Sequence, residues 1–318
     1  MMDIITITFN PCIDKSTSVS ALKPEKKLRC AAPTFEPGGG GINVARAIKK
    51  IGGEALAIYP CGGYSGKFLN VLLERENISA LTIETRKHTR ENMIVLDTAT
   101  NQQYRFGMPG PQLFEDEWKQ CLQTIKENHS GYIVASGSLP PGVPEDIFAR
   151  ISKIAKKGNR NLIVDSTDEA LQSALAEGVY MIKPNIGELS RLVGKEELKS
   201  DEIEPAAKEL ISKGKCEIVV VSLGASGVML VSKEQVFKIS APAVKIKSTV
   251  GAGDSLVAGI VFYISKGKSL YEALQYGVAC GTAATLNNGK GLCRKEDLER
   301  LFKQIKSDTS LEIILQIK

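Results

Sequence analysis

Short apolar runs rich in β-branched residues alternate along this chain with longer segments of helical periodicity. Several of the runs are apolar at consecutive positions, as is typical of strands that are covered on both faces. The helical segments are amphipathic; one spans residues 42–52 and another spans 255–267, and each ends at glycine. The alternation predicts an α/β fold with a mostly parallel sheet and helices on both sides. The expected strands are residues 4–9, 55–60, 132–137, 161–166, 180–184 and 218–224.

Two segments break this alternation. Residues 15–35 are polar and alternate weakly, and residues 89–107 have the pattern of a β-hairpin with the turn TATNQ at 98–102. Neither fits a strand–helix–strand unit, so we expect a small β layer that projects from the main domain. This layer could be a lid or an oligomer contact, and a plain exposed hairpin fits the periodicity equally well. The length of 318 residues permits one large domain or two smaller ones.

Composition narrows the classes of function. The formal net charge of +5 comes without a dense Lys/Arg run, which argues against a nucleic-acid partner and is compatible with anionic small substrates. Seven scattered cysteines without C-x-x-C spacing and only two histidines argue against a zinc site. No leader-like segment follows Met1, and the longest apolar run, 256–264, is half as long as a membrane span. We therefore expect a cytoplasmic protein with reduced cysteines and no membrane contact.

The sequence STVGAGDS at 248–255 leads from small residues into an apolar helical segment. The backbone N–H groups of Gly251, Ala252 and Gly253 can converge at the start of this helix and form an anion site. Asp254 follows directly. A carboxylate in this place makes chemical sense if it accepts the proton of a hydroxyl group that attacks a phosphate. Asp254 could equally be the N-cap of the helix.

The commoner phosphate-binding motifs are absent from the sequence. The stretch closest to a G-x-x-x-x-G-K-[ST] loop, residues 62–68, is one residue short and has Phe68 where Ser or Thr is needed. No G-x-G-x-x-G follows the first expected strand, which argues against a dinucleotide-binding oxidoreductase.

Two further segments follow expected strands, at the edge where α/β folds bind ligands. In KPNIGEL at 183–189, Asn185 and Glu188 could hold a hydrated Mg²⁺ through oxygen atoms, or they could form a capping box. The sequence VVVSLGASG at 219–227 suits a nucleotide, and a simple turn explains it equally well.

Candidate sugar-binding residues lie near the first strand. Asp14 comes just after it, and the glycine run Gly38–Gly41 begins a helical segment. A buried carboxylate beside bare backbone amides suits a polyol, whose hydroxyl groups need both acceptors and donors. Arg29 and Arg90 lie on the irregular β segments and could bind a phosphate, although most exposed arginines are simply solvated.

Together these motifs resemble the ribokinase-like, or PfkB, family of carbohydrate kinases, nearly from end to end. The resemblance is carried by GGGGINVARAIKKIGG at 38–53 and by STVGAGDSLVAG at 248–259. Within the family, the chain is most similar to the minor-type 6-phosphofructokinase branch, through LRCAAPTFEPGGGGINVARA at 28–47, QYRFGMPG at 103–110 and SGSLPPGV at 136–143.

The resemblance implies a single domain over residues 1–318 with a three-layer α/β/α fold, a mostly parallel central sheet and a small β-sheet lid from about 15–35 and 89–107. It implies a homodimer that forms through the lids. The implied reaction is ATP-dependent phosphorylation of the C1 hydroxyl of fructose 6-phosphate, with Mg²⁺ and K⁺ as cofactors. Asp254 would be the catalytic base, and the amides of Gly251, Ala252 and Gly253 would stabilise charge on the transferring phosphoryl group.

The resemblance also assigns binding residues. The sugar phosphate would contact Asp14, Gly39, Gly40, Asn43, Arg90 and Ser138, with Lys27 and Arg29 of the lid, which could reach in from a partner subunit. The nucleotide positions would be Lys183, Asn185, Ser222, Gly224, Gly227 and Thr282. Glu188 belongs to an N-x-x-E motif that is associated with Mg²⁺. The K⁺ ligands would be backbone carbonyls near Ser248, Val250, Ala284, Asn287 and Gly289.

One departure from the family bears on the substrate. Relatives that phosphorylate fructose 1-phosphate or tagatose 6-phosphate commonly read G-G-K-G at Gly38–Gly41, so Gly40 stands where they have lysine. This favours fructose 6-phosphate and leaves a 1-phosphofructokinase or a tagatose-6-phosphate kinase as the alternative. A non-catalytic sugar-phosphate or nucleotide sensor on the same fold would need a broken active site, yet Asp14, Asn43, Glu188 and Asp254 are all present.

Overall fold

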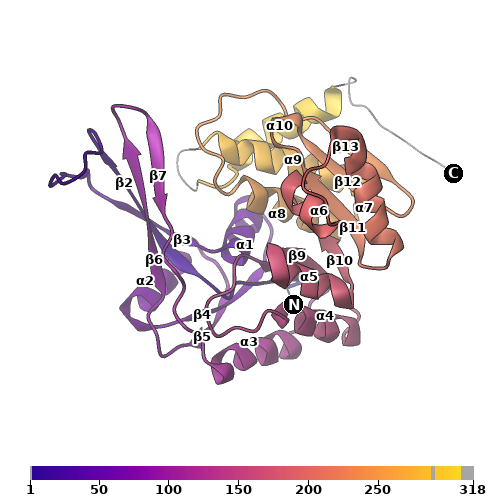
Figure 1. The fold of residues 1–318 in the computed structure, drawn as a ribbon, viewed down its shortest axis with the longest axis horizontal. Coiled ribbons are helices and arrows are strands. Elements are labelled where there is room, and N and C mark those ends of the chain that lie inside the picture. The colour runs from indigo at the N-terminus through magenta and orange to yellow at the C-terminus, as the bar shows by residue number, and fades with distance from the viewer. Residues whose placement is uncertain (1, 288–290, 309–318) are drawn as a thin grey trace.

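The computed structural model describes residues 2–287 and 291–308, and within them a nine-stranded sheet forms the centre of the molecule (Figure 1). The strand order is β13-β12-β11-β10-β9-β8-β1-β4-β5. Neighbouring strands from β11 to β5 are parallel, whereas β12 and β13 are antiparallel to their neighbours. The strands are β1 (Ile4–Ile7), β4 (Leu56–Cys61), β5 (Ala80–Glu84), β8 (Tyr132–Ser136), β9 (Asn161–Asp165), β10 (Val179–Ile182), β11 (Cys216–Ser222), β12 (Val228–Ser232) and β13 (Val236–Ile239).

All six expected strands lie in this sheet, and the predicted mostly parallel arrangement is confirmed. Successive residues of a buried strand pack into two different cores: Ile4 belongs to one core and Ile5 to the other, and Ile163 and Leu162 are divided in the same way. Both faces of the sheet are therefore covered, which explains why the expected strands are apolar at consecutive positions rather than at alternate ones.

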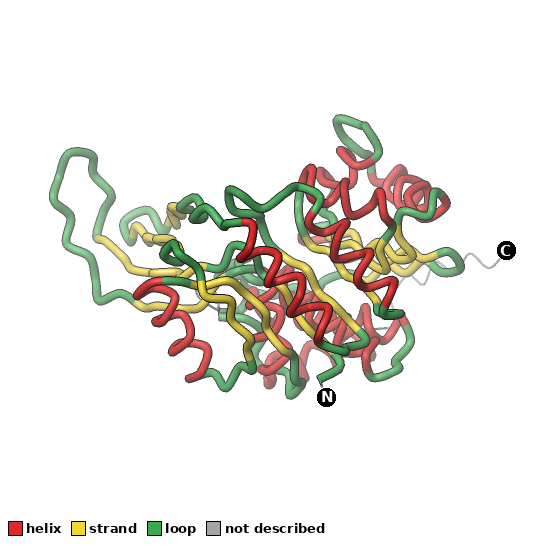
Figure 2. The backbone as a smooth tube through the Cα atoms, turned by 90° about the horizontal axis from the view of Figure 1, so that it is seen from below, coloured by secondary structure: helices red, strands yellow, loops and turns green. Residues whose placement is uncertain are grey.

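Helices supply the other half of each core, so the molecule has three layers (Figures 1 and 2). One layer is α1 (Gly40–Lys50), α2 (Gly63–Arg75), α8 (Ala252–Ser265), α9 (Leu270–Thr285) and α10 (Lys295–Ser307). The other is α3 (Glu115–Glu127), α4 (Ile147–Lys157), α5 (Asp168–Glu177), α6 (Ile186–Leu192) and α7 (Ile203–Ser212). Two short 3₁₀ turns are η1 (Ser200–Glu202) and η2 (Gly224–Ser226). No helix in the described parts of the chain is long and apolar enough to cross a bilayer.

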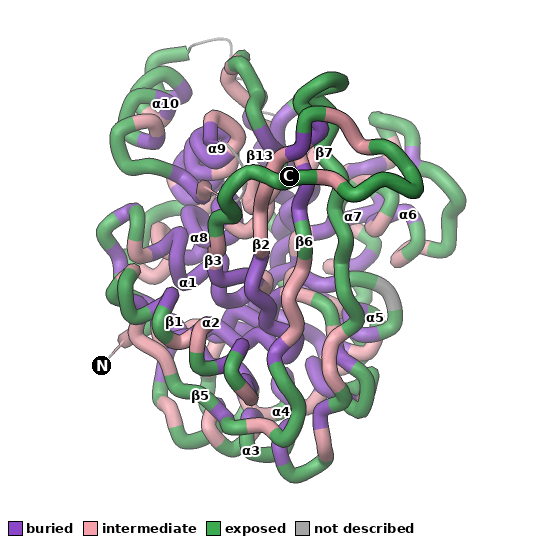
Figure 3. The backbone as a smooth tube through the Cα atoms, turned by 90° about the vertical axis from the view of Figure 1, so that its left-hand side faces the viewer, coloured by how far each residue is buried: buried purple, intermediate pink, exposed green. Residues whose placement is uncertain are grey.

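A second, four-stranded sheet stands beside the main one, on the left in Figure 1. Its order is β3 (Thr34–Gly38), β2 (Cys12–Val19), β6 (Arg90–Asp97) and β7 (Gln102–Phe106). The expected hairpin is present as β6 and β7, which pair in antiparallel fashion. Figure 3 faces this sheet and shows that β7 is exposed along its whole length. The first irregular segment starts earlier than expected, because β2 begins at Cys12 rather than after Asp14.

The chain changes direction across the main sheet between β1 and β8. From β1 it adds β4 and β5 on one side, and it later returns to add β8 and the following strands on the other side. In parallel α/β sheets, ligands bind at the carboxyl ends of the strands beside such a reversal. The segments that follow β1, β8, β9, β10 and β11 therefore meet at the edge where a site is expected.

Candidate active site

The glycine run lies against this edge of the sheet. A Cβ atom on Gly40 would lie 2.2 Å from Oγ of Ser136 and 2.8 Å from the backbone nitrogen of Gly137, and a Cβ on Gly41 would lie 2.6 Å from the carbonyl oxygen of Ile7. Gly39, the N-cap of α1, has a φ of 117°. Glycine is thus required because the start of α1 touches the ends of β1 and β8. This close approach places Asn43, in the first turn of α1, at the edge of the sheet.

Asp254 lies in the first turn of α8, the other helix that begins at this edge. The N-cap of α8 is Gly251 in a left-handed conformation, so the alternative that Asp254 caps the helix is wrong. Oδ2 of Asp254 instead accepts a hydrogen bond of 2.9 Å from Nδ2 of Asn43. The N–H groups of a helix's first turn have no acceptor within the helix. A carboxylate and a set of backbone donors therefore lie side by side at the start of α8.

Lys183 brings a positive charge to the same place. It follows β10, and its Nζ lies 3.1 Å from Oδ1 of Asp165 at the end of β9, with both side chains mostly buried. The same amine lies next to Gly253, since a Cβ there would be 3.6 Å from Nζ. Burial acts to lower the pKa of Lys183, but the attraction of Asp165, Glu188 and Asp254 outweighs it and the pKa is raised. The amine is therefore a cation at neutral pH, beside the amides of α8.

Asn185 and Glu188 form a capping box at the start of α6. Oδ1 of Asn185 accepts from the backbone N–H of Glu188 at 2.8 Å, and Oε2 of Glu188 accepts from the N–H of Asn185 at 2.9 Å. The capping box that the sequence offered as one alternative is therefore present. The carboxylate of Glu188 also helps to raise the pKa of Lys183.

A cavity of about 640 Å³ opens between these elements, within the size range of small-molecule sites. It reaches Ala252 and Gly253 at the start of α8, and Val244, Leu256 and Val278 give it an apolar wall. The 219–227 loop is also a tight turn, in which the N–H of Leu223 donates to the carbonyl of Gly227. Five of the six predicted nucleotide residues line the cavity: Asn185, Ser222, Gly224, Gly227 and Thr282.

The predicted sugar-phosphate residues gather where the smaller sheet meets the main one. Asp14 is buried, and its Oδ1 accepts from Nδ2 of Asn92 at 3.0 Å. Arg90 donates to the carbonyl of Asn10 at 2.9 Å, and Nδ2 of Asn10 donates to Oγ of Ser138 at 3.1 Å. Asn10 thereby joins the two predicted phosphate contacts. Neither Asn10 nor Asn92 was expected from the sequence, because Asn10 contacts a residue 128 positions away and Asn92 contacts one 78 positions away.

Lys27 and Arg29 are not joined to the other residues. Both lie on the exposed loop between β2 and β3, and neither makes an ion pair with any residue in the described part of the chain. Their contact with the sugar phosphate therefore stays a prediction.

The predicted potassium residues lie on two segments that are tied together. The N–H groups of Lys247 and Ser248 donate to the carbonyl of Thr285, which links the loop before α8 to the end of α9. Val250 belongs to the same loop, and Ala284 and Asn287 lie at the end of α9. Gly289 lies outside the described residues. In the part of the chain that is described, no group of three or more His, Cys, Asp or Glu residues could hold a metal ion.

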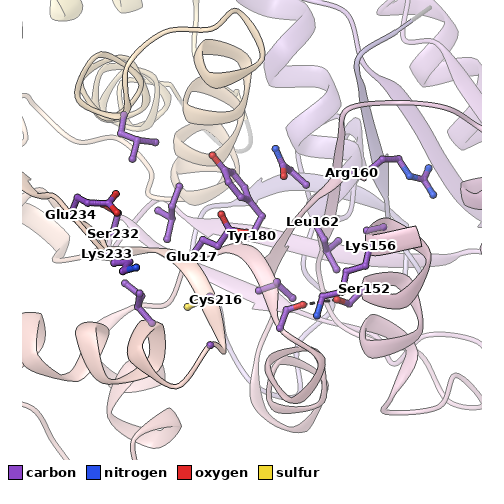
Figure 4. A pocket seen from close by; sticks show the side chains of 18 of the residues that line it. Ser152, Lys156, Arg160, Leu162, Tyr180, Cys216, Glu217, Ser232, Lys233 and Glu234 are labelled. Atoms are coloured by element: carbon purple, nitrogen blue, oxygen red, sulfur yellow. Dashed lines mark hydrogen bonds between the residues drawn. The ribbon is translucent and has the colours of Figure 1, made fainter. Parts of the chain in front are cut away.

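A second cavity, of about 520 Å³, lies at the opposite edge of the sheet (Figure 4). It is lined by the first residues of β9, β10 and β11, and by side chains of both charges, including Lys156, Arg160, Glu217 and Glu234. None of the predicted site residues line it. This cavity is therefore separate from the edge of the sheet at which the predicted site residues lie.

The fold, together with the position of these residues at the carboxyl ends of the strands, is that of a kinase that phosphorylates a small hydroxylated molecule. More specifically, the chain belongs to the pfkB family of carbohydrate kinases, which matches residues 2–297. The family and the ribokinase-like fold predicted from the sequence motifs are confirmed.

The chain is similar to characterised members over almost its whole length. It is 46% identical over 304 residues to the ATP-dependent 6-phosphofructokinase isozyme 2 of Escherichia coli K12, covering 95% of this chain and 98% of that protein. It is 31% identical to the 1-phosphofructokinase of Bacillus subtilis, also over 95% of this chain and 98% of that one.

Crystal structures of phosphofructokinase-2 from Escherichia coli match the fold closely. The complex with potassium has a TM-score of 0.93 at 45% identity, and the complex with fructose 6-phosphate has a TM-score of 0.90 at 43% identity. Each match covers 96% of this chain and 100% of the other.

Proposed function

We propose that this protein is an ATP-dependent 6-phosphofructokinase, which converts fructose 6-phosphate to fructose 1,6-bisphosphate in the cytoplasm. The observation that carries the proposal is the contact of Asn43 with Asp254 in the first turn of α8, beside a cavity of nucleotide size. The similarity to a 6-phosphofructokinase of Escherichia coli at 46% identity supports the choice of substrate.

Asp254 is the proposed base. It accepts the proton of the C1 hydroxyl while the C1 oxygen forms a bond to the γ-phosphorus of ATP, and the bond from that phosphorus to the bridging oxygen breaks to release ADP. The amides of Gly251, Ala252 and Gly253 stabilise the charge on the transferring phosphoryl group. Lys183 adds a fixed positive charge beside the same amides. Its raised pKa supports this role, because the amine stays protonated at neutral pH.

The sugar phosphate is proposed to bind on the other side of Asp254. Asp14, Gly39, Gly40 and Asn43 hold its hydroxyl groups. Arg90 and Ser138 contact the 6-phosphate, and their shared link through Asn10 supports this assignment. The nucleotide occupies the cavity that Asn185, Ser222, Gly224, Gly227 and Thr282 line, with Lys183 at its phosphate end.

Both proposed ions fit the donor atoms of the chain. The carboxylate of Glu188 lies close enough to Lys183 to help raise its pKa, and a single carboxylate with bound water suits Mg²⁺, so Glu188 is the proposed residue for a hydrated ion that offsets phosphate charge. The loop of Ser248 and Val250 is tied to the end of α9, near Ala284 and Asn287, so that backbone carbonyl oxygens from both segments can serve a K⁺ ion, with Gly289 as a further proposed ligand. The potassium complex of the Escherichia coli relative supports this second site.

We further propose that the chain is one domain over residues 1–318 in which the smaller sheet is a lid, and that two lids pack together in a homodimer. Met93, Tyr104 and Phe106 of that sheet are large apolar residues with 38%, 38% and 46% of their surfaces exposed, which supports burial in a second subunit. In such a dimer, Lys27 and Arg29 of the partner's exposed loop could reach the sugar phosphate.

The test of the function is a panel of phosphosugars. Purified protein is assayed with ATP and with fructose 6-phosphate, fructose 1-phosphate and tagatose 6-phosphate, each with and without K⁺. We expect the highest kcat/KM for fructose 6-phosphate. An equal or higher value for either other sugar overturns the assignment of fructose 6-phosphate as the substrate. It favours instead a tagatose-6-phosphate kinase or a 1-phosphofructokinase, an activity that a relative from Bacillus subtilis is named for.

A further inference from the structure

Among the residues that the structure describes, Arg46 is the largest side chain that is almost completely buried, with 2% of its surface exposed. Its guanidinium donates from Nε and Nη2 to the two carboxylate oxygens of Glu76, at 2.8 and 2.6 Å. Glu76 caps the end of α2. Nη1 donates to the carbonyl oxygen of Pro37 in β3 at 2.9 Å and to Oδ1 of Asn43 at 3.4 Å. One buried cation thus ties together α1, α2 and the smaller sheet.

The side-chain amide of Asn43 lies between Arg46 and Asp254. A guanidinium can only donate hydrogen bonds, and an ionised carboxylate can only accept them. The amide oxygen must therefore face Arg46, and the NH₂ group must face Asp254. The opposite orientation would place N–H against N–H and oxygen against a carboxylate oxygen. Arg46 thus selects the orientation in which Asn43 donates to Asp254 at 2.9 Å.

We propose that Arg46 is a positioning residue for phosphoryl transfer, which acts through Asn43 to hold the carboxylate of Asp254. The proposal rests on the proposed function in one respect, namely that Asp254 is the base. A buried, charged guanidinium is not needed for stability as such, because apolar residues of similar volume can replace buried ion pairs. Its forked geometry does serve orientation, since Glu76 fixes one side of the group while the other side faces Asn43.

The test is a double-mutant cycle on kcat. Arg46→Lys keeps the charge and loses the fork, so we expect kcat to fall roughly 10- to 100-fold with the KM for ATP within about twofold. In an Asn43→Ala background, Arg46→Lys should change kcat by less than about twofold, because the residue through which it acts is gone. Equal effects in both backgrounds overturn the proposal, as does an unchanged kcat in Arg46→Lys alone.

The matched control is Arg160→Lys. The partly buried guanidinium of Arg160 also donates to backbone carbonyls, those of Ile125 and Asn128, at 2.9 and 2.7 Å. It lies away from the candidate active site. It should lower the Tm without changing kcat, which separates positioning from loss of stability. If Arg46→Lys does not fold, Glu76→Gln removes the charge of the anchor and keeps the guanidinium; the same cycle then predicts a smaller loss of kcat that disappears in the Asn43→Ala background.

A crystal structure of the folded variant, Arg46→Lys or otherwise Glu76→Gln, gives a readout that does not depend on the substrate. We expect the contact of Asn43 with Asp254 to be broken or the amide to have turned. If the contact is retained with unchanged rotamers, the proposal is wrong even if the protein is a 6-phosphofructokinase. If the wild type phosphorylates a different sugar, the proposed function fails, and the cycle is measured with that sugar instead.

Discussion

Nδ2 of Asn43 donates a hydrogen bond of 2.9 Å to Oδ2 of Asp254, although 211 positions separate the two residues in the chain. The contact joins the first turns of α1 and α8, whose buried faces share one core through residues such as Ile48 and Ile260. Packing of the two helices therefore sets the position of the carboxylate. Substitutions that remove this carboxylate and substitutions that alter its surroundings should therefore have different effects on activity and stability.

Asp254→Asn keeps the shape of the side chain and removes the proton acceptor. A general base contributes roughly 10²- to 10⁴-fold to a rate, so we expect kcat to fall by about that factor. The Kd values for ATP and fructose 6-phosphate, measured by calorimetry, should change by less than about fivefold, because binding does not require proton transfer. Asp201→Asn, at an exposed position in η1, is the control with unchanged kcat. Turnover retained in Asp254→Asn would falsify the assignment of the base.

The elements that could be predicted are those whose signal is local. Strands β1, β8 and β9 are buried on both faces, so their sequences are apolar at consecutive positions. The start of α8 was found because glycine and small residues must precede a helix that binds an anion. By contrast, β5 was missed because it is an edge strand in which only Ile83 is buried. The pair β12 and β13 was missed because no helix separates these strands, so they do not belong to the alternating pattern.

The parts of the site that could not be predicted are relationships between distant residues. Asn10 carries no motif, and its importance appears only when Arg90 and Ser138 are seen on either side of it. In the sequence, Arg46 looks like any other charged residue on a helix. Its ion pair could not be predicted, because its partner Glu76 is 30 positions away. Conversely, the alternative that Asp254 caps the helix was excluded only by the observed start of α8, where Gly251 is the N-cap.

Lys183→Met should reveal the pH range over which the ion pair with Asp165 stabilises the fold. The pKa of Lys183 is raised, so the stabilisation is fully present below the ordinary lysine value of about 10.4 and is lost as the pH rises through the higher folded value. Below about pH 10 we expect the variant to lose roughly 1–3 kcal/mol of unfolding free energy, because a buried carboxylate loses its partner. Urea denaturation of both proteins between pH 6 and 11 measures this difference.

The difference between wild type and Lys183→Met should stay constant up to about pH 10 and then narrow. Lys303→Met, at an exposed position in α10, controls for general effects of losing an ammonium group and should show almost no difference at any pH. A gap that narrows between pH 6 and 9 instead would contradict a raised pKa.

Gly40→Ala tests whether the close approach of α1 to the main sheet requires glycine. The added Cβ would lie 2.2 Å from Oγ of Ser136 and 2.8 Å from the backbone nitrogen of Gly137, so α1 or the end of β8 must move. Overpacking of this kind costs about 1–3 kcal/mol of unfolding free energy. We also expect kcat/KM for fructose 6-phosphate to fall, because Asn43 moves with α1. Denaturant unfolding and the coupled assay measure the two effects.

Gly107→Ala is the matched control for Gly40→Ala. A Cβ at Gly107 would meet no atom within 4 Å, and its φ is not in the left-handed region. It should therefore leave the unfolding free energy within about 0.5 kcal/mol of wild type. If the two glycine variants lose similar amounts of stability, steric contact at Gly40 is not the cause.

Phe106→Glu tests the proposed packing of two smaller sheets. Phe106 pairs with Met93 across β6 and β7, and 46% and 38% of their surfaces are exposed, so a charge placed there would be buried without a partner in a dimer that covers this face. We expect the dimer dissociation constant, measured by analytical ultracentrifugation, to rise at least about 10-fold, since an unpaired charge at an interface typically costs 2 kcal/mol or more. Leu81→Glu changes a residue of similar exposure, 40%, on the edge strand β5 of the main sheet, and should leave the dissociation constant unchanged. Should Leu81→Glu weaken the dimer while Phe106→Glu does not, subunits associate through the edge of the main sheet and Lys27 and Arg29 have no role across the interface.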